Sequence, residues 1–143
     1  LSNDYRSYTQ QVIRNSNAFS YAMKENGFNI VSNGTDNHLF LVDLQSKQIT
    51  GKDAEQLLIK ADITTNKNMI PNDPASPMVT SGIRLGTAAL TSRGFKESEF
   101  VQTANWINYL ITNRENELKI KELRNQINQF MKNFPLYPEI QID

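Results

Sequence analysis

Arg84 stands between Ile83 and Leu85 in the segment SGIRLGT. Successive side chains of a strand point to opposite faces, so the two apolar neighbours would enter a core and the guanidinium would point away from it. A guanidinium in that position can hold a carboxylate through two parallel hydrogen bonds. The same placement fits an arginine that is solvated on a strand, and the local pattern leaves both interpretations open.

The segment 66–82, which precedes this arginine, is polar and stiffened by prolines. Pro71, Pro74 and Pro77 follow one another at intervals of three. No helix can run through this spacing, because each ring removes a backbone donor and clashes with the preceding turn. Long polar loops inside compact domains are usually functional or disordered. The prolines favour an ordered, functional loop.

Other side chains that can react or bind metals give weaker signals. His38 opens an apolar segment, and we interpret it as a structural histidine with its hydrogen bonds satisfied. Asp36 and Asp43 flank it as turn and strand-end residues, and Lys67 is interpreted as a surface lysine. With one His and no Cys, the chain cannot build a two-His metal site, a thiolate zinc site or a disulfide. We therefore expect no metal site.

The composition excludes further classes of function. Fifteen Lys and Arg balance fifteen Asp and Glu, so nothing points to a nucleic-acid partner. No apolar run approaches the roughly 18 residues of a membrane span, and there is no Walker A, GxGxxG or HExxH motif. The length of 143 residues predicts one domain with its own core. Because the chain opens with Leu1 and without a signal peptide, we expect a piece of a longer protein.

The hydrophobic pattern predicts the helices that would position these residues. Apolar residues recur at helical spacing over 4–26, and Gly27 supplies the left-handed cap that ends this helix. Thr50 followed by Asp53 begins a short helix. Two longer helices are expected near 96–112 and 114–133.

Strands are expected between these helices, at 28–31, 38–44, 63–65 and 83–87. Asn33-Gly34 is a strong turn signal between the first two. The order is helix, two strands, helix, two short strands, two helices. It predicts an α+β fold, a two-layer sandwich in which helices cover a small, mainly antiparallel sheet.

Several long segments resemble the C-terminal part of serine hydroxymethyltransferase. They are GTDNHLFLVDL (34–44), ITGKDAE (49–55), NKNMIPNDPASPMVTSGIRLGT (66–87) and TSRGFKESEF (91–100), and the resemblance covers about residues 4–112 in order. This family consists of fold-type I pyridoxal phosphate enzymes that transfer the hydroxymethyl carbon of serine to tetrahydrofolate, leaving glycine. The resemblance implies that residues 1–143 are the small C-terminal domain of such an enzyme. It also implies a cytoplasmic, homodimeric parent acting in glycine biosynthesis and one-carbon metabolism.

The resemblance assigns roles to individual residues. Arg84 matches the arginine that holds the carboxylate of the amino-acid substrate, and Asn68 in NKN matches a residue that contacts the folate pteridine. Ser76-Pro77-Met78 match a folate-contacting loop segment that is usually Ser-Pro-Phe. Met78 departs from that pattern, and a flexible thioether fills the space of an aromatic ring less rigidly. Ala88 stands where the family often has proline.

The resemblance also implies what this chain lacks. The lysine that binds the cofactor and the residues around the pyridoxal ring and phosphate belong to the large domain, and this chain has no counterpart of them. No catalytic residue is therefore expected here, and the fragment alone is expected to be inactive. One rival interpretation is the small domain of another fold-type I enzyme, an aldolase or aminotransferase, against which the folate-loop motif argues. The other rival is a non-catalytic, stand-alone binding module.

Overall fold

The computed structural model describes residues 2–33 and 37–136, so Gly34 and Asp36 lie outside the described residues. The described part is α+β, as the sequence predicted. Its elements in chain order are α1 (Asn3–Glu25), β1 (Asn29–Ile30), the 3-10 turn η1 (Val31–Asn33), β2 (Leu39–Asp43), the 3-10 turn η2 (Gln45–Lys47), α2 (Gly51–Lys60), β3 (Asn66–Asn68), β4 (Gly82–Gly86), α3 (Ala88–Ser92), α4 (Glu97–Thr112) and α5 (Glu117–Met131).

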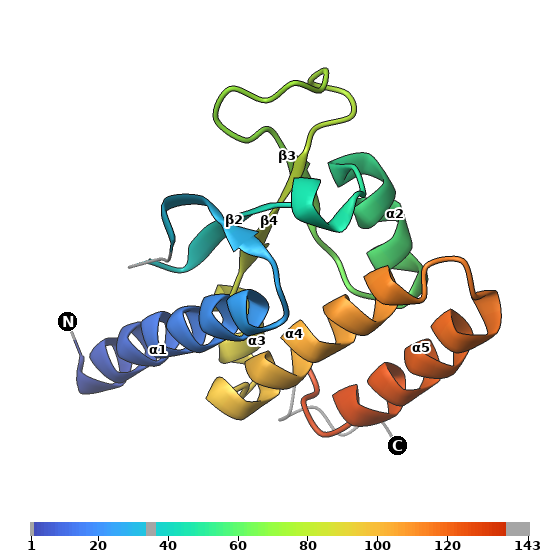
Figure 1. Ribbon diagram of the computed structural model, residues 1–143. Helices are drawn as coiled ribbons and strands as arrows, with labels where there is room; N and C mark the ends of the chain where they lie inside the picture. Colours follow the sequence, from blue (N-terminus) through green and yellow to red (C-terminus); the bar gives the residue numbers. More distant parts are fainter. Residues whose placement is uncertain (1, 34–36, 137–143) are drawn as a thin grey trace.

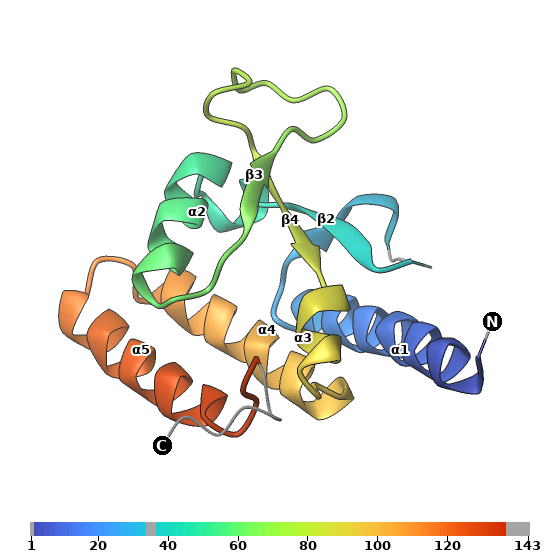
Figure 2. The same cartoon turned by 180° about the vertical axis from the view of Figure 1, so that it is seen from behind.

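The four strands form one antiparallel sheet in the order β1-β2-β4-β3. Helices α1, α2 and α4 gather on one side of it, and α5 lies outside α4 (Figure 1). The loop between β3 and β4 extends beyond the end of the sheet, away from α3, as both views show (Figure 2). The small two-layer arrangement expected from the sequence is confirmed.

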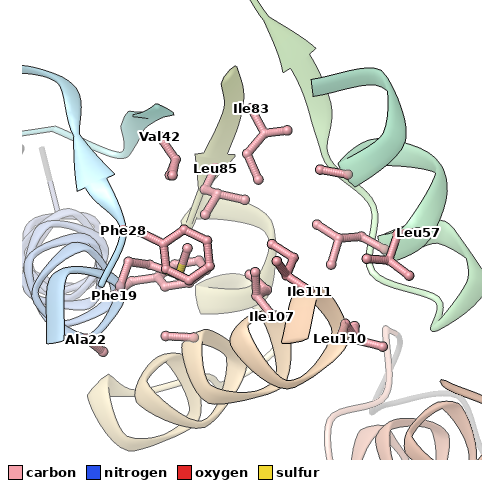
Figure 3. Close-up of a cluster of buried hydrophobic side chains, with 14 of the residues drawn as sticks. Phe19, Ala22, Phe28, Val42, Leu57, Ile83, Leu85, Ile107, Leu110 and Ile111 are labelled. Atoms are coloured by element: carbon pink, nitrogen blue, oxygen red, sulfur yellow. The ribbon is translucent and has the colours of Figure 1, made fainter. Parts of the chain in front are cut away.

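The core lies between the sheet and the helices. Apolar side chains from α1, β2, α2, β4 and α4 converge there (Figure 3). Phe19 stacks edge-on against Phe40, with ring centroids 5.2 Å apart, and lies 5.3 Å from Phe100. Phe100 also meets Phe95 at 5.3 Å, so this ring joins the two longest helices to the turn before α4.

Helix α1 ends as its sequence predicts. Gly27 has a φ of +85°, and the N–H of Phe28 donates to the carbonyl of Met23. This is the bond pattern of a Schellman cap, in which glycine takes the left-handed position. The cap reverses the chain, so that β1 can pair with β2 above the helix.

The strand expected at 63–65 is wrong by three residues, since β3 covers Asn66–Asn68. The Ile63 N–H donates to the Leu58 carbonyl, and Asp62 takes a left-handed φ of +62°. Ile63 thus belongs to the cap that closes α2 rather than to a strand. The polar segment after it pairs with β4, and the Lys67 N–H donates to the Glu55 carboxylate, 2.7 Å away.

The short helix α3 was not among the expected elements. It begins directly after β4, and Ala88 is its first residue. The first helical position suits proline, whose fixed φ is already helical and whose missing N–H has no partner to lose there. The Thr87 hydroxyl donates to the Val12 carbonyl and so holds the β4–α3 junction against α1.

We predict that this chain folds by itself, because its helices and strands enclose a continuous apolar core. Thermal unfolding should be cooperative, with a circular dichroism spectrum of mixed helix and strand. Phe100→Ala should lower the free energy of unfolding by about 3–5 kcal/mol, since Phe100 is fully buried.

Leu118→Ala on α5 is the matched control. Its side chain is 66% exposed, and truncation there should change stability by less than about 0.5 kcal/mol. A broad, non-cooperative melt of the wild-type chain would show that the core needs the remainder of a longer protein.

Candidate functional site

Arg84 lies in the middle of β4, with Leu41 of β2 on one side and Asn66 of β3 on the other. Ile83 and Leu85 are buried, whereas Arg84 is exposed. The predicted alternation is therefore confirmed, and the arginine projects from the face opposite the core. Within the described residues its guanidinium has no hydrogen bond or ion pair. It is available to a ligand or to another part of the protein.

Asn68 lies on the same face of the sheet as Arg84. In the antiparallel register Asn66 faces Arg84 and Asn68 faces Gly82, so Asn68 is the diagonal neighbour of the arginine. Such diagonal positions are about 7–8 Å apart. The Asn68 amide donates to the Met69 carbonyl at 2.9 Å, which leaves its oxygen as an acceptor. The register thus brings together two of the residues singled out from the sequence.

Ser76, Pro77 and Met78 occupy the exposed return limb of the β3–β4 loop. The Ser76 carbonyl accepts from the N–H groups of Val79 and Thr80 at 3.0 and 2.9 Å, forming a tight turn. Met78 is 76% exposed. These three residues touch neither Arg84 nor Asn68 through any described hydrogen bond. They share with those residues one hairpin, whose two strands enter and leave the loop (Figure 1).

Sequence reasoning missed the residue that organises this loop, Asp73. Its carboxylate accepts four hydrogen bonds: from the N–H of Ile70 at 3.2 Å, of Ala75 at 2.8 Å and of Ser81 at 2.8 Å, and from the Ser81 hydroxyl at 2.7 Å. The signal was present, because Asn72-Asp73-Pro74 is a typical turn sequence in which aspartate bonds to nearby backbone. The reach to Ser81, eight residues on, is not visible in any local pattern.

The hydrogen bonds around Asp73 also change its acidity. Desolvation is the largest single effect and by itself would raise the pKa. The bonds from the Ser81 hydroxyl and from the N–H groups of Ala75, Ser81 and Ile70 together outweigh it, and they lower the pKa of Asp73 to about 2. The carboxylate is thus held in the ionised form that accepts all four bonds.

The N-terminus of α2 fastens the end of the loop. The N–H groups of Gly51 and Lys52 donate to the carbonyls of Thr80 and Val79 at 3.0 and 2.9 Å. A Cβ on Gly51 would lie 2.0 Å from the Thr80 hydroxyl and 2.3 Å from the Gly82 carbonyl oxygen, so this approach requires glycine. Two donors of the helix end are thereby satisfied by the loop.

The weaker candidates from the sequence take ordinary places. Asp43 ends β2 and accepts from the Gln45 N–H at 2.9 Å, as a strand-end residue would. His38 is exposed, and its ring has no hydrogen bond within the described residues, so the interpretation as a satisfied structural histidine is wrong. The backbone carbonyl of His38 accepts a hydrogen bond from the Thr87 N–H. The Lys67 ammonium donates to the Met78 carbonyl at 2.7 Å, on the outside of the loop.

Two classes of site find no support in the described part of the chain. Across residues 2–33 and 37–136, no three His, Asp or Glu side chains come close enough to hold a metal ion. None of the helices described there has the length and apolar character of a membrane span. A solvent-open hollow of about 660 Å³ lies between η2, α2 and the end of α4, but neither Arg84 nor Asn68 lines it.

The described residues thus form a small α+β domain with an exposed arginine on the outer face of its sheet, beside an ordered polar loop. Comparison with known proteins identifies the family. The family model for serine hydroxymethyltransferase matches residues 1–107, and the chain belongs to this family.

Curated relatives named serine hydroxymethyltransferase agree with this assignment. The chain is 53% identical to the protein of Idiomarina loihiensis, 51% identical to that of Pseudoalteromonas atlantica and 48% identical to that of Halorhodospira halophila. Each comparison covers 96% of this chain but 33% of the relative. The chain thus spans about a third of the length of the curated relatives it matches.

The geometry of Asp73 predicts an acid-sensitive loop. Its folded pKa of about 2 lies below the ordinary 3.8, so the unfolded chain takes up the proton first as the pH falls. The stabilisation by Asp73 is complete above the ordinary pKa and is lost as the pH drops through 3.8 towards 2. Asp73→Asn should therefore be less stable than wild type at pH 7, and the difference should shrink below pH 3.8. Urea unfolding from pH 7 to pH 2 measures this.

Asp53→Asn is the matched control, because the Asp53 side chain accepts no hydrogen bond in the described residues and lies on the adjoining helix α2. Its free energy of unfolding should change by less than about 1 kcal/mol at pH 7, because within the described residues Asp53 interacts only with the dipole of the first turn of α2. If the Asp73 variant loses no more stability than this control, the four hydrogen bonds do not contribute to folding.

Proposed function

We propose that this chain forms the part of a serine hydroxymethyltransferase that holds the carboxylate of serine and glycine and the pterin of tetrahydrofolate. The observation that carries the proposal is Arg84, an exposed guanidinium with no partner in the described residues, fixed between two strands and beside Asn68. Family membership supports the same assignment. Further expectations for the parent are a cytoplasmic homodimer that acts in glycine biosynthesis and one-carbon metabolism.

The role of Arg84 in this proposal is positioning. Its planar fork would bind the substrate carboxylate through two charge-assisted hydrogen bonds and so fix the rotation of the amino acid about its Cα. The strand supplies the rigidity, since the flanking residues Ile83 and Leu85 are locked in the core. A fixed carboxylate sets the direction of the Cα–Cβ bond that must be broken or formed.

The described residues do not themselves fit pyridoxal phosphate. None of the described lysines is buried, and the Lys67 ammonium donates a hydrogen bond to the Met78 carbonyl. The cofactor would be held by the two-thirds of the enzyme that this chain does not span, and there it supplies an electron sink for carbanion chemistry. The roles proposed for the residues of this chain do not require contact with the cofactor.

The folate part of the proposal rests on the hairpin. Asn68 keeps its amide oxygen free to accept, and Ser76-Pro77-Met78 form an exposed edge on the loop above it. An amide and a hydroxyl suit the polar edge of a pterin, while the Met78 thioether suits its ring face. The rival, another fold-type I enzyme such as an aldolase or aminotransferase, would use the arginine but not this edge. Activity that depends on tetrahydrofolate separates the two.

In the full-length protein, Arg84→Ala should weaken glycine and serine binding, because the carboxylate loses a bidentate partner. Breaking such a pair in a desolvated site costs on the order of 2–5 kcal/mol. Arg84→Lys should recover little, since an ammonium cannot reproduce the fork. Glycine affinity is measured by spectral titration of the holoenzyme.

Cofactor content and thermal stability serve as internal controls in the Arg84 variants. Both should stay near wild type, because the Arg84 guanidinium makes no hydrogen bond or ion pair within the described residues and Arg84 is exposed. Equal glycine affinities for wild type and Arg84→Ala would mean that the arginine is merely solvated on its strand.

The isolated chain should have no hydroxymethyltransferase activity. Mixing it with pyridoxal phosphate should give slow, non-saturating labelling of several lysines, because none of the described lysines is buried. Mass spectrometry after reduction measures the sites and their stoichiometry. A stoichiometric, saturable adduct at Lys67 would contradict the proposal and assign the cofactor to this chain.

A further inference from the structure

We propose that Asp73 is the positioning residue of the β3–β4 loop, and that its carboxylate sets the conformation in which Ser76-Pro77-Met78 meet the folate. This inference rests on the proposed function. Nothing in the sequence resemblance assigned Asp73 a role. The hydrogen bonds of its carboxylate indicate this role.

The carboxylate joins the two limbs of the loop. Ile70 lies on the limb that leaves β3, and Ser81 lies on the limb that enters β4. Ser81 gives Asp73 both its N–H and its hydroxyl, at 2.8 and 2.7 Å. Among the described hydrogen bonds, these two are the ones that join the outgoing limb (69–75) to the return limb (76–81). Without them the outgoing limb has no polar tie to the return limb.

The remaining fastenings hold the return limb alone. The α2 N-terminus bonds Val79 and Thr80, and the Lys67 ammonium bonds the Met78 carbonyl. The return limb is therefore anchored to the body of the domain, but the turn that leads into Ser76 is not. Its shape depends on Asp73, whose carboxylate also accepts the Ala75 N–H at 2.8 Å, one residue before Ser76.

The site requires a carboxylate rather than a side chain of the same size. Three N–H groups and one hydroxyl converge on two oxygens. An asparagine offers one acceptor oxygen and turns an NH₂ group toward groups that are themselves donors. Asp73→Asn keeps the shape of the side chain but loses hydrogen bonds that the carboxylate accepts. Ser81→Ala removes one of the four bonds and keeps the other three, which makes it the graded variant.

The experiment compares the full-length enzyme with Asp73→Asn, Ser81→Ala and the control Asp53→Asn. Misplacing a binding group by about 1 Å can cost up to about a hundredfold, so we expect Asp73→Asn to raise the KM for tetrahydrofolate by about tenfold or more. We expect a rise of about two- to threefold for Ser81→Ala and none for Asp53→Asn. The KM for serine and the affinity for glycine should stay within about twofold of wild type in all three, because they report on Arg84.

Hydrogen exchange of the isolated chain gives a readout that is independent of activity. Amides 70–81 should exchange faster in Asp73→Asn and, to a smaller degree, in Ser81→Ala, while the core helices keep their protection. Should Asp73→Asn fail to fold, the loop exchange rates and the tetrahydrofolate KM of the Ser81→Ala variant still test the inference. Faster loop exchange with an unchanged tetrahydrofolate KM would overturn the inference, as would equal changes in the KM values for serine and tetrahydrofolate. A wild-type enzyme that does not use tetrahydrofolate would overturn the proposed function instead.

Discussion

The packing of β4 between β2 and β3 is the constraint on which the site depends. Ile83 and Leu85 enter the core from one face of this strand, and Arg84 leaves from the other. A slip of one residue in the pairing would exchange the faces and place a guanidinium among phenylalanines and leucines. Because that exchange would bury a charge, the core enforces the register, and the register places Arg84. The position of a solvent-exposed arginine is thus set by side chains on the opposite, buried face of the sheet.

The loop beside Arg84 is ordered by a different means. Apart from Ile70, its side chains add little to the core, so its backbone groups need polar partners. Asp73 accepts from three of its N–H groups, and the first turn of α2 donates N–H groups to two of its carbonyls. The closeness of Gly51 to Thr80 and Gly82 shows how tightly the helix end meets the loop. A hydrogen-bonded loop of this kind can present an exposed edge without losing a fixed shape.

The sequence was informative where one periodicity extended over a whole element. Helices α1, α4 and α5 followed from apolar spacing, and the position of Arg84 followed from strand alternation. It failed where tertiary contacts override local pattern. Ile63 looks like a strand residue but closes the cap of α2, whereas the polar Asn66–Asn68 segment becomes β3 because β4 offers it partners. Asp73 was missed for the same reason, since its essential partner Ser81 is distant in sequence.

Under the proposed function, the exposure of Arg84 allows the domain to fold by itself while its own affinity for a carboxylate stays weak. An exposed guanidinium keeps its hydration, so it costs the isolated domain little, and an exposed ion pair with a carboxylate gains only about 0–1 kcal/mol. The same pair becomes far stronger once water is excluded and the effective dielectric falls. Under the proposed function, this chain orients the substrate carboxylate. The part of the protein outside this chain excludes water from the ion pair. The division lets the domain fold on its apolar core first, because the charge that binds substrate does not have to be buried until the two parts meet around the ligand.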